Sequence, residues 1–143
     1  EMFVRYAQIA ALMPVMQFSA SPWRVLPEAD FQKVKDALAL REKCLPEILK
    51  AVECAKVTGE PIVRSMEFVF PGQGMERVMD QFMVGEDLLV APVWKRGEVA
   101  RSVRLPEGQW RCVGLGETEG DVLNGGRDVI LGENDGLVVL RRV

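Results

Sequence analysis

The sequence contains no histidine among its 143 residues, and this absence excludes several kinds of chemistry. Without an imidazole, Ser-His and Cys-His nucleophile pairs cannot form, so carboxylates remain the main candidates for acid–base chemistry. Cysteine is also scarce, because Cys44, Cys54 and Cys112 make an odd set without C-x-x-C spacing. We therefore predict buried apolar residues or free thiols at these positions, no metal site and no cofactor.

Long apolar runs and clusters of one charge are missing as well. The net charge is −3 and the basic residues form no stripe, so we predict no nucleic-acid partner. No apolar run approaches the length of a transmembrane helix and no signal-peptide pattern stands at the start, so we predict no membrane contact. The chain opens on Glu1 inside a helical pattern, which indicates a fragment whose upstream part can hold any targeting signal. Compartment and oligomeric state are left open.

The first half of the chain shows a strand-loop-helix-strand pattern. After an amphipathic helix from Glu1 to about Leu12, Val15 to Phe18 predicts a strand that ends in a proline-containing loop with Trp23. A long helix is expected from Asp30 to Thr58, and a second strand from Pro61 to Phe70. This order predicts a right-handed crossover unit of a parallel sheet, in which ligands bind at the carboxyl ends of the strands. A site is therefore expected between the first strand and the long helix.

The long helix carries its own start and stop signals. Asp30 is the expected cap and Gly59 the expected stop. Pro46 lies inside the pattern, where a proline loses a hydrogen bond and clashes with the preceding turn. We predict that Pro46 begins a second helical segment or kinks one long helix.

The second half reads as short strands joined by tight turns. Asp80 to Gly85 and Leu88 to Val93 predict two strands around an acidic Glu86-Asp87 turn. Neighbouring turn carboxylates point to different sides, so we interpret this pair as a turn rather than as an acid and a base. Further runs and turns predict an antiparallel sheet or half of a β-sandwich, in which Trp110 is a packing residue. The runs are Val99–Leu105, Gln109–Val113, Asp128–Leu131 and Leu137–Leu140, and the turns are 106–108, 114–120, 124–126 and 134–136.

Three blocks carry a resemblance to a known family. They are R-Y-A-Q-I-A-A-L-M-P-V-M-Q-F-S-A-S-P-W (5–23), T-G-E-P-I-V-R (58–64) and D-Q-F-M-V-G-E-D-L-L-V-A-P-V (80–93). In order and spacing they resemble the carboxy-terminal part of glycoside hydrolase family 31. The resemblance implies an α/β fold: residues 1–79 as the last strands and helices of a (β/α)8 TIM barrel, and residues 80–143 as a C-terminal β-domain, sandwich-like. Arg64 is then expected to brace the barrel by pairing with an upstream carboxylate.

The resemblance also implies a function and a set of site residues. Family members hydrolyse α-linked sugars with retention through two aspartates, both expected upstream of Glu1, so no catalytic residue is assigned here. Where the family commonly has R-N-H, this chain has Gln17-Phe18-Ser19, and Ser19 replaces a histidine that contacts the sugar. The expected substrate-binding residues are therefore Gln17, Phe18, Ser19 and Trp23. Considered by itself, Phe18 is more typical of a core residue. For Trp23, a core role and a sugar-platform role are equally supported.

The implied substrate is a carbohydrate, and the implied partner is the upstream remainder of the same polypeptide. The M-Q-F-S-x-x-P-W form is similar to an α-galactosidase-type branch, but α-galactoside and α-glucoside both stay open. The isolated chain is expected to be inactive, and marginally folded unless the β-domain stands alone. The alternative is a non-catalytic α+β carbohydrate-binding or interaction module with Trp23 and Trp110 as surface platforms. The absence of histidine and of paired acids favours this module, whereas the three-block resemblance favours the enzyme fragment.

Overall fold

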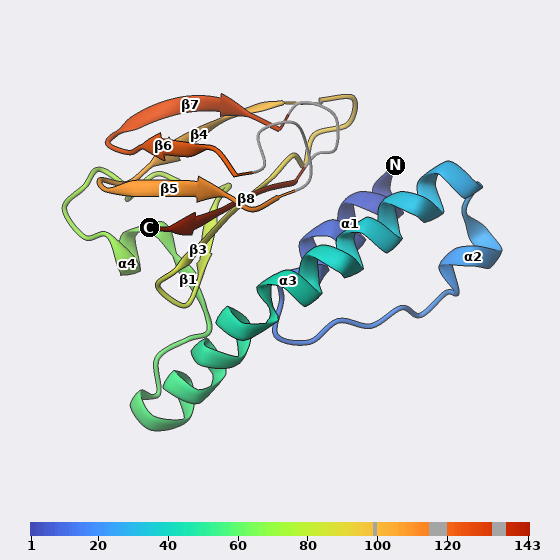
Figure 1. Ribbon diagram of the computed structural model, residues 1–143, viewed down its shortest axis with the longest axis horizontal. Helices are drawn as coiled ribbons and strands as arrows, with labels where there is room; N and C mark the ends of the chain where they lie inside the picture. The colour runs from blue at the N-terminus through green and yellow to red at the C-terminus, as the bar shows by residue number, and fades with distance from the viewer. Residues whose placement is uncertain (99, 115–119, 133–136) are drawn as a thin grey trace.

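The computed structural model describes residues 1–98, 100–114, 120–132 and 137–143, and shows a helical amino-terminal part followed by antiparallel strands (Figure 1). The helices are α1 (Met2–Ala11), α2 (Pro22–Val25), α3 (Glu28–Thr58) and α4 (Met66–Val69). The strands are β1 (Val63–Ser65), β2 (Phe82–Val84), β3 (Leu88–Pro92), β4 (Arg101–Leu105), β5 (Gln109–Cys112), β6 (Val122–Asn124), β7 (Arg127–Leu131) and β8 (Leu137–Arg142). Within the described ranges, no helix is long and apolar enough to cross a membrane.

The two long helices form where they were predicted, but their buried faces are centred on Ala7 in α1 and on Ala37, Cys44 and Ala51 in α3, while Tyr6 and Leu49 are exposed. Helix α3 stops at Gly59, whose φ of 76° is the left-handed conformation that glycine adopts without strain, as predicted. The prediction of Asp30 as the cap is wrong, because the helix already begins at Glu28 after Pro27. Glu28 and Asp30 instead lie in the first turn, where negative charge favours the helix dipole. Pro46 does not begin a second segment, since α3 continues through it as one helix.

The expected strand at Val15–Phe18 is not formed. These residues run as irregular structure between α1 and α2, and every pairing among the described strands is antiparallel. The predicted parallel crossover unit is therefore not shown by this structure. The physical reason is that a strand needs a partner for its backbone N–H and C=O groups, and no described segment pairs with Val15–Phe18. The barrel part of the expected fold is thus not shown.

The expected strand from Pro61 to Phe70 is also shorter than predicted. Only Val63–Ser65 is extended, and the chain then forms one helical turn, α4. The Ser65 hydroxyl causes the switch, because it accepts a hydrogen bond of 3.3 Å from the backbone N–H of Phe68 and so caps the turn. An apolar run alone did not reveal this cap.

The strands form one six-stranded sheet of order β1-β2-β3-β8-β5-β6 and a two-stranded ribbon of β4 and β7. The predicted β2–turn–β3 hairpin is confirmed, as are the strands at β4, β5, β7 and β8. Strand β6 was missed because three residues give no readable alternation. Val99 and most residues of the predicted turns 114–120 and 134–136 lie outside the described residues.

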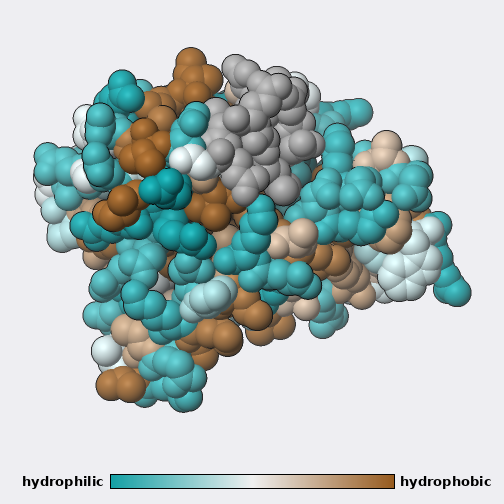
Figure 2. All heavy atoms as spheres, viewed as in Figure 1, coloured by the Kyte–Doolittle hydropathy of each residue, from teal (hydrophilic) through white to brown (hydrophobic). Residues whose placement is uncertain are grey.

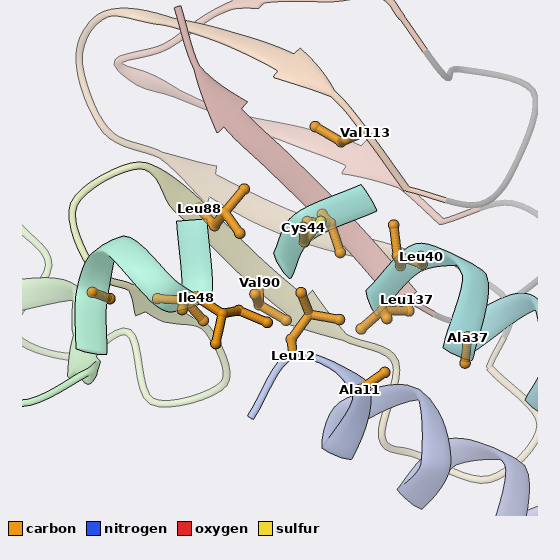
Figure 3. Packing of buried hydrophobic residues seen from close by; sticks show 13 residues of the cluster. Ala11, Leu12, Ala37, Leu40, Cys44, Ile48, Leu88, Val90, Val113 and Leu137 are labelled. Carbon is orange, nitrogen blue, oxygen red and sulfur yellow. The ribbon is translucent and has the colours of Figure 1, made fainter. Parts of the chain in front are cut away.

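Alternating residues of the central strands place a core on each face of the large sheet. Leu88 and Val90 face α1 and α3, where they pack with Leu12, Leu40 and Ile48 (Figure 3). Their neighbours Leu89 and Ala91 lie in a second core with Trp110, Phe70 and residues of the β4–β7 ribbon. The helical part and the sheet are therefore joined by a continuous apolar layer.

Trp110 is fully buried in the second core, so its predicted packing role is confirmed. Its indole N–H donates to the carbonyl of Pro106 at 2.9 Å, and its ring meets Phe70 edge-on. Trp110 consequently has no surface to offer as a sugar platform, and that part of the alternative prediction is wrong. Cys44, Cys54 and Cys112 form no disulfide, and Cys44 and Cys112 are buried, as predicted.

Candidate sugar-binding hollow

Three of the four predicted site residues meet in one open hollow of about 510 Å³ beside the start of α1. The hollow is lined by Phe3, Tyr6, Val15, Gln17, Phe18, Ser19 and Ala20. Gln17 and Ser19 are exposed there, so their amide and hydroxyl groups are accessible to a ligand. The loop after α1 thus brings together Gln17, Phe18 and Ser19 without a flanking strand.

Phe18 supports the hollow rather than serving only as core or only as platform. Its ring stacks on that of Phe3, with centroids 6.0 Å apart and planes within 2°. Both side chains pack against a small cluster of Val4, Ala7 and Val34. Phe18 remains half-buried, which leaves part of its surface in the hollow. The aromatic pair therefore fixes the loop on α1 and forms the apolar wall.

Arg41 on α3 holds the same loop from the other side, and sequence reasoning missed it. Its guanidinium donates to the carbonyls of Ala11 at 2.8 Å, Met13 at 2.6 Å and Pro14 at 3.1 Å. These groups include the last carbonyls of α1, which have no partner within the helix. In the sequence Arg41 is one of several charged residues of α3, and no spacing signal distinguishes it.

Trp23 lies apart from this hollow. It belongs to α2, is 66% exposed and is not among the lining residues. Proline at the first position of α2 fixes the turn that presents it. The structure therefore confirms that Trp23 is on the surface but does not bring it to Gln17 and Ser19.

The hollow itself carries no charged lining residue. A carboxylate in the vicinity, Glu1, is engaged elsewhere: the backbone N–H of Gly97 donates to it at 2.8 Å, and this bond lowers the pKa of Glu1. Among the described residues no group of His, Cys, Asp and Glu is arranged to hold a metal ion. The arrangement can bind a neutral polar ligand, but the described lining residues supply no carboxylate for acid–base chemistry.

The acidic turn behaves as predicted for a turn rather than for a catalytic pair. Asp87 pairs with Lys50 of α3 at 2.6 Å, and Glu86 pairs with Arg64 at 3.5 Å. The hydrogen bond that the Lys50 ammonium donates to Asp87 raises the pKa of Lys50. Arg64 is buried and also pairs with Glu60 at 2.9 Å. Its partners in this chain are thus Glu60 and Glu86, and the pairing with an upstream carboxylate stays a prediction.

Comparison with known proteins gives consistent matches. Residues 59–130 match the family model described as the glycosyl hydrolase family 31 C-terminal domain. The myogenesis-regulating glycosidase of Mus musculus is 39% identical over 112 residues, covering 78% of this chain and 16% of that protein. An alpha-glucosidase of Saccharolobus solfataricus is 36% identical over 101 residues, covering 70% of this chain and 14% of that protein.

A solved structure matches almost the whole fold. The cycloalternan-forming enzyme from Listeria monocytogenes, in complex with a pentasaccharide substrate, superposes with a TM-score of 0.88 at 28% identity. The match covers 99% of this chain and 14% of that enzyme. The chain therefore spans about one sixth or less of the length of these relatives.

Proposed function

Because this chain belongs to glycosyl hydrolase family 31, we propose that it is the C-terminal part of a retaining hydrolase of α-linked O-glycosidic bonds. The substrate is of the α-galactoside or α-glucoside type, and its breakdown belongs to carbohydrate metabolism. One observation carries the proposal: the open hollow presents Gln17, Phe18 and Ser19, while no carboxylate lines it. Such a surface suits one wall of a sugar subsite whose reacting groups come from elsewhere.

Retaining hydrolysis needs two carboxyl groups about 5 Å apart on opposite sides of the scissile bond. One attacks the anomeric carbon, and the other protonates the leaving oxygen and later activates water. We assign both to the upstream remainder of the polypeptide. In this proposal residues 1–79 complete the barrel and residues 80–143 form the β-domain that supports it.

The side chains of this chain then bind and orient the sugar. The Gln17 amide can donate and accept hydrogen bonds, and the Ser19 hydroxyl can do both at shorter reach. The half-buried Phe18 ring, held by Phe3, offers an apolar surface to the C–H face of a sugar ring. Trp23 is kept as a substrate-binding residue for a more distant sugar unit, since it lies outside the hollow.

Ser19 is the residue that we expect to influence the choice of sugar. A hydroxymethyl group fills less space than the histidine common in the family and donates from a different position. The subsite is therefore widened next to Gln17. A widened subsite accommodates a different arrangement of sugar hydroxyls, and this is the basis for leaving both galactoside and glucoside as substrates.

The test is hydrolysis of nitrophenyl α-galactoside, α-glucoside and α-xyloside by the full-length parent, with the 143-residue chain assayed beside it. We expect cleavage by the parent and none by the chain. Gln17→Ala in the parent is expected to lower kcat/KM about tenfold or more, as for loss of one subsite hydrogen bond. Phe68→Ala, which removes an exposed aromatic outside the hollow, should leave kcat/KM unchanged.

Ser19→His in the parent tests the specificity argument directly. We expect the ratio of kcat/KM values for galactoside and glucoside to change. Any change is due to this residue, because the parent and its variant differ only at position 19. Turnover by the isolated chain would contradict the assignment of the carboxylates to the upstream part. No cleavage by the parent would favour the non-catalytic carbohydrate-binding module.

A further inference from the structure

A second hollow, of about 350 Å³, lies between the end of β3 and the start of β4. Its polar, charged and aromatic lining residues are Asp80, Trp94, Lys95, Glu98, Arg101 and Ser102. None of them belongs to the Gln17 hollow. The volume falls in the range of small-ligand sites and is large enough for one or two sugar rings.

Trp94 is the feature of this hollow that lacks a structural explanation. It is 60% exposed, whereas Trp110 on β5 is fully buried. Lys95 lies over one face of the indole, with its ammonium nitrogen 5.5 Å from the ring centroid, so the opposite face is the one open to a ligand. A large aromatic surface left in water beside a hollow is typical of a binding site.

A buried arginine fixes the polar wall opposite. Arg101 has a side chain that is only 7% exposed, and its guanidinium pairs with the Asp80 carboxylate at 2.5 Å. The same guanidinium donates to the carbonyls of Asp80 at 2.6 Å and Pro92 at 2.8 Å. Asp80 is thereby held in one orientation while 47% of its side chain stays exposed. A preorganised acceptor of this kind loses little conformational entropy when a ligand binds.

The charges of this hollow are already matched within it. Arg101 is neutralised by Asp80, and Lys95 pairs with Glu98 at 3.4 Å. Neither Arg101 nor Lys95, the two cations among these lining residues, therefore has an unpaired positive charge with which to bind an anionic ligand. The exposed Ser102 hydroxyl and the carboxylate oxygens can instead exchange hydrogen bonds with hydroxyl groups. The hollow therefore suits a neutral, polyhydroxylated ligand.

We propose that this hollow is a second saccharide-binding site, which takes neutral hexose units with Trp94 against the ring face and Asp80 and Ser102 bonded to hydroxyls. It goes beyond the proposed hydrolysis, because it requires no catalytic group. The loop that forms it is fixed on α1, since Arg5 donates to the carbonyl of Glu98 at 2.9 Å and Glu1 accepts from Gly97. Both hollows thus adjoin the first turns of α1 but share no lining residue.

The three tryptophans provide a direct test on the 143-residue chain. Each contributes one indole N–H signal to the NMR spectrum, and single Trp→Phe variants assign them. We expect isomaltotriose to shift the Trp94 signal saturably, with a dissociation constant in the millimolar range that about 4 kcal/mol of binding provides. The buried Trp110 signal, whose N–H is bonded to Pro106, is the internal reference and should not move.

Variants separate this site from the other hollow. Trp94→Ala is expected to weaken binding at least about tenfold, measured on the tryptophan-independent amide signals of Ser102 and its neighbours. Phe68→Ala removes an aromatic that is 50% exposed and lies outside both hollows, and it should change the affinity less than about two-fold. Gln17→Ala should leave the Trp94 shift intact.

The proposal is overturned if no saturable shift of Trp94 occurs, whether because the sugar does not bind or because the chain does not hold this hollow. It is also overturned if Gln17→Ala abolishes the shift, or if glucose 6-sulfate binds more tightly than isomaltotriose. Activity of the parent on small nitrophenyl glycosides is expected to be unaffected by Trp94→Ala. Failure of this site and failure of the proposed hydrolysis are therefore observed in different experiments.

Discussion

The six-stranded sheet and the loop of residues 12–27 are built in opposite ways. All residues of β3 are buried, and most of β8 is too, because each face of the sheet has its own core. In the loop, Gln17, Ser19 and Trp23 are exposed, and the main anchors are the Phe3–Phe18 stack and Arg41. The comparison indicates that stability resides in the sheet, whereas the candidate sugar contacts lie on a segment that few interactions hold.

Figure 2 shows how hydrophobic and hydrophilic residues are distributed on one face of the surface. Hydrophobic atoms on this face lie in separate patches among hydrophilic ones, and one patch lies where β6 and β7 run. These two strands carry the exposed Val122 and Ile130. The apolar residues that determine the fold are therefore mostly hidden between the layers, whereas the exposed Tyr6 and Val15 line the Gln17 hollow.

The strongest test of the comparison is removal of the largest buried side chain of the sheet. Trp110→Ala should lower the free energy of unfolding by about 3–5 kcal/mol, since it leaves a cavity and frees the carbonyl of Pro106. Trp23→Ala should change it by less than about 0.5 kcal/mol, because that ring is exposed. Urea unfolding followed by circular dichroism measures both. Equal losses would show that the loop contributes to stability as much as the sheet does.

A second test uses two glycines with opposite constraints. A Cβ at Gly125 would lie 1.8 Å from the carbonyl oxygen of Pro106, so Gly125→Ala must displace backbone and should cost about 3 kcal/mol. Gly59, at the end of α3, has a φ of +76° but no atom within 4 Å of an added Cβ. Gly59→Ala should cost only about 1 kcal/mol, from backbone strain alone. A reversed order of these losses would contradict the tight packing inferred for the β-strand region.

Loosening the loop should leave the sheet intact. Arg41→Met removes three hydrogen bonds to the carbonyls at the end of α1 and should lower stability by about 2 kcal/mol. Hydrogen exchange should accelerate in residues 11–19, while β3 and β8 remain protected. Arg41→Lys keeps the charge but cannot reach all three carbonyls, so an intermediate effect is expected. Uniform acceleration across the sheet would show that the two regions are not separable.

Much of the fold could be predicted because its signals are local. The 3.6-residue period gave α1 and α3, and Gly59 gave the end of α3. The Glu86-Asp87 turn between two apolar runs gave the β2–β3 hairpin. These features depend on neighbours in sequence, which is why pattern and propensity suffice for them.

The failures have two causes, contacts that are distant in sequence and a local side-chain cap at Ser65. Whether Val15–Phe18 is a strand depends on a partner, and whether Pro61–Phe70 continues depends on the Ser65 hydroxyl. In the candidate site, Gln17 and Ser19 came from the resemblance and do share a hollow, but Arg41 is 22 or more residues away in the chain. Trp94 carried no motif at all, and only its exposure beside Asp80 and Arg101 distinguishes it.

The prediction with the smallest expected effect tests the apolar layer that joins the helices to the sheet. Cys44 of α3 lies in the core between the helices and the sheet, and burial, with a further contribution from Glu47, raises the pKa of its thiol from 9.0 to about 11. The unfolded chain therefore loses this proton at a lower pH than the folded chain does. Stability from this group is complete below pH 9 and is lost as the pH rises through 11.

The expected loss is about 1 kcal/mol at pH 10, because one unit of pKa difference corresponds to about 1.4 kcal/mol. Cys44→Ala should lower stability at pH 7 through the lost packing, yet show a shallower decline between pH 8 and pH 10 than the unmodified chain. Cys54→Ala, which removes a half-buried thiol of the same helix, is the matched control variant. Identical slopes for the unmodified chain and Cys44→Ala would mean that water reaches this thiol, and hence that the helices and the sheet are not closed on one another as the structure shows.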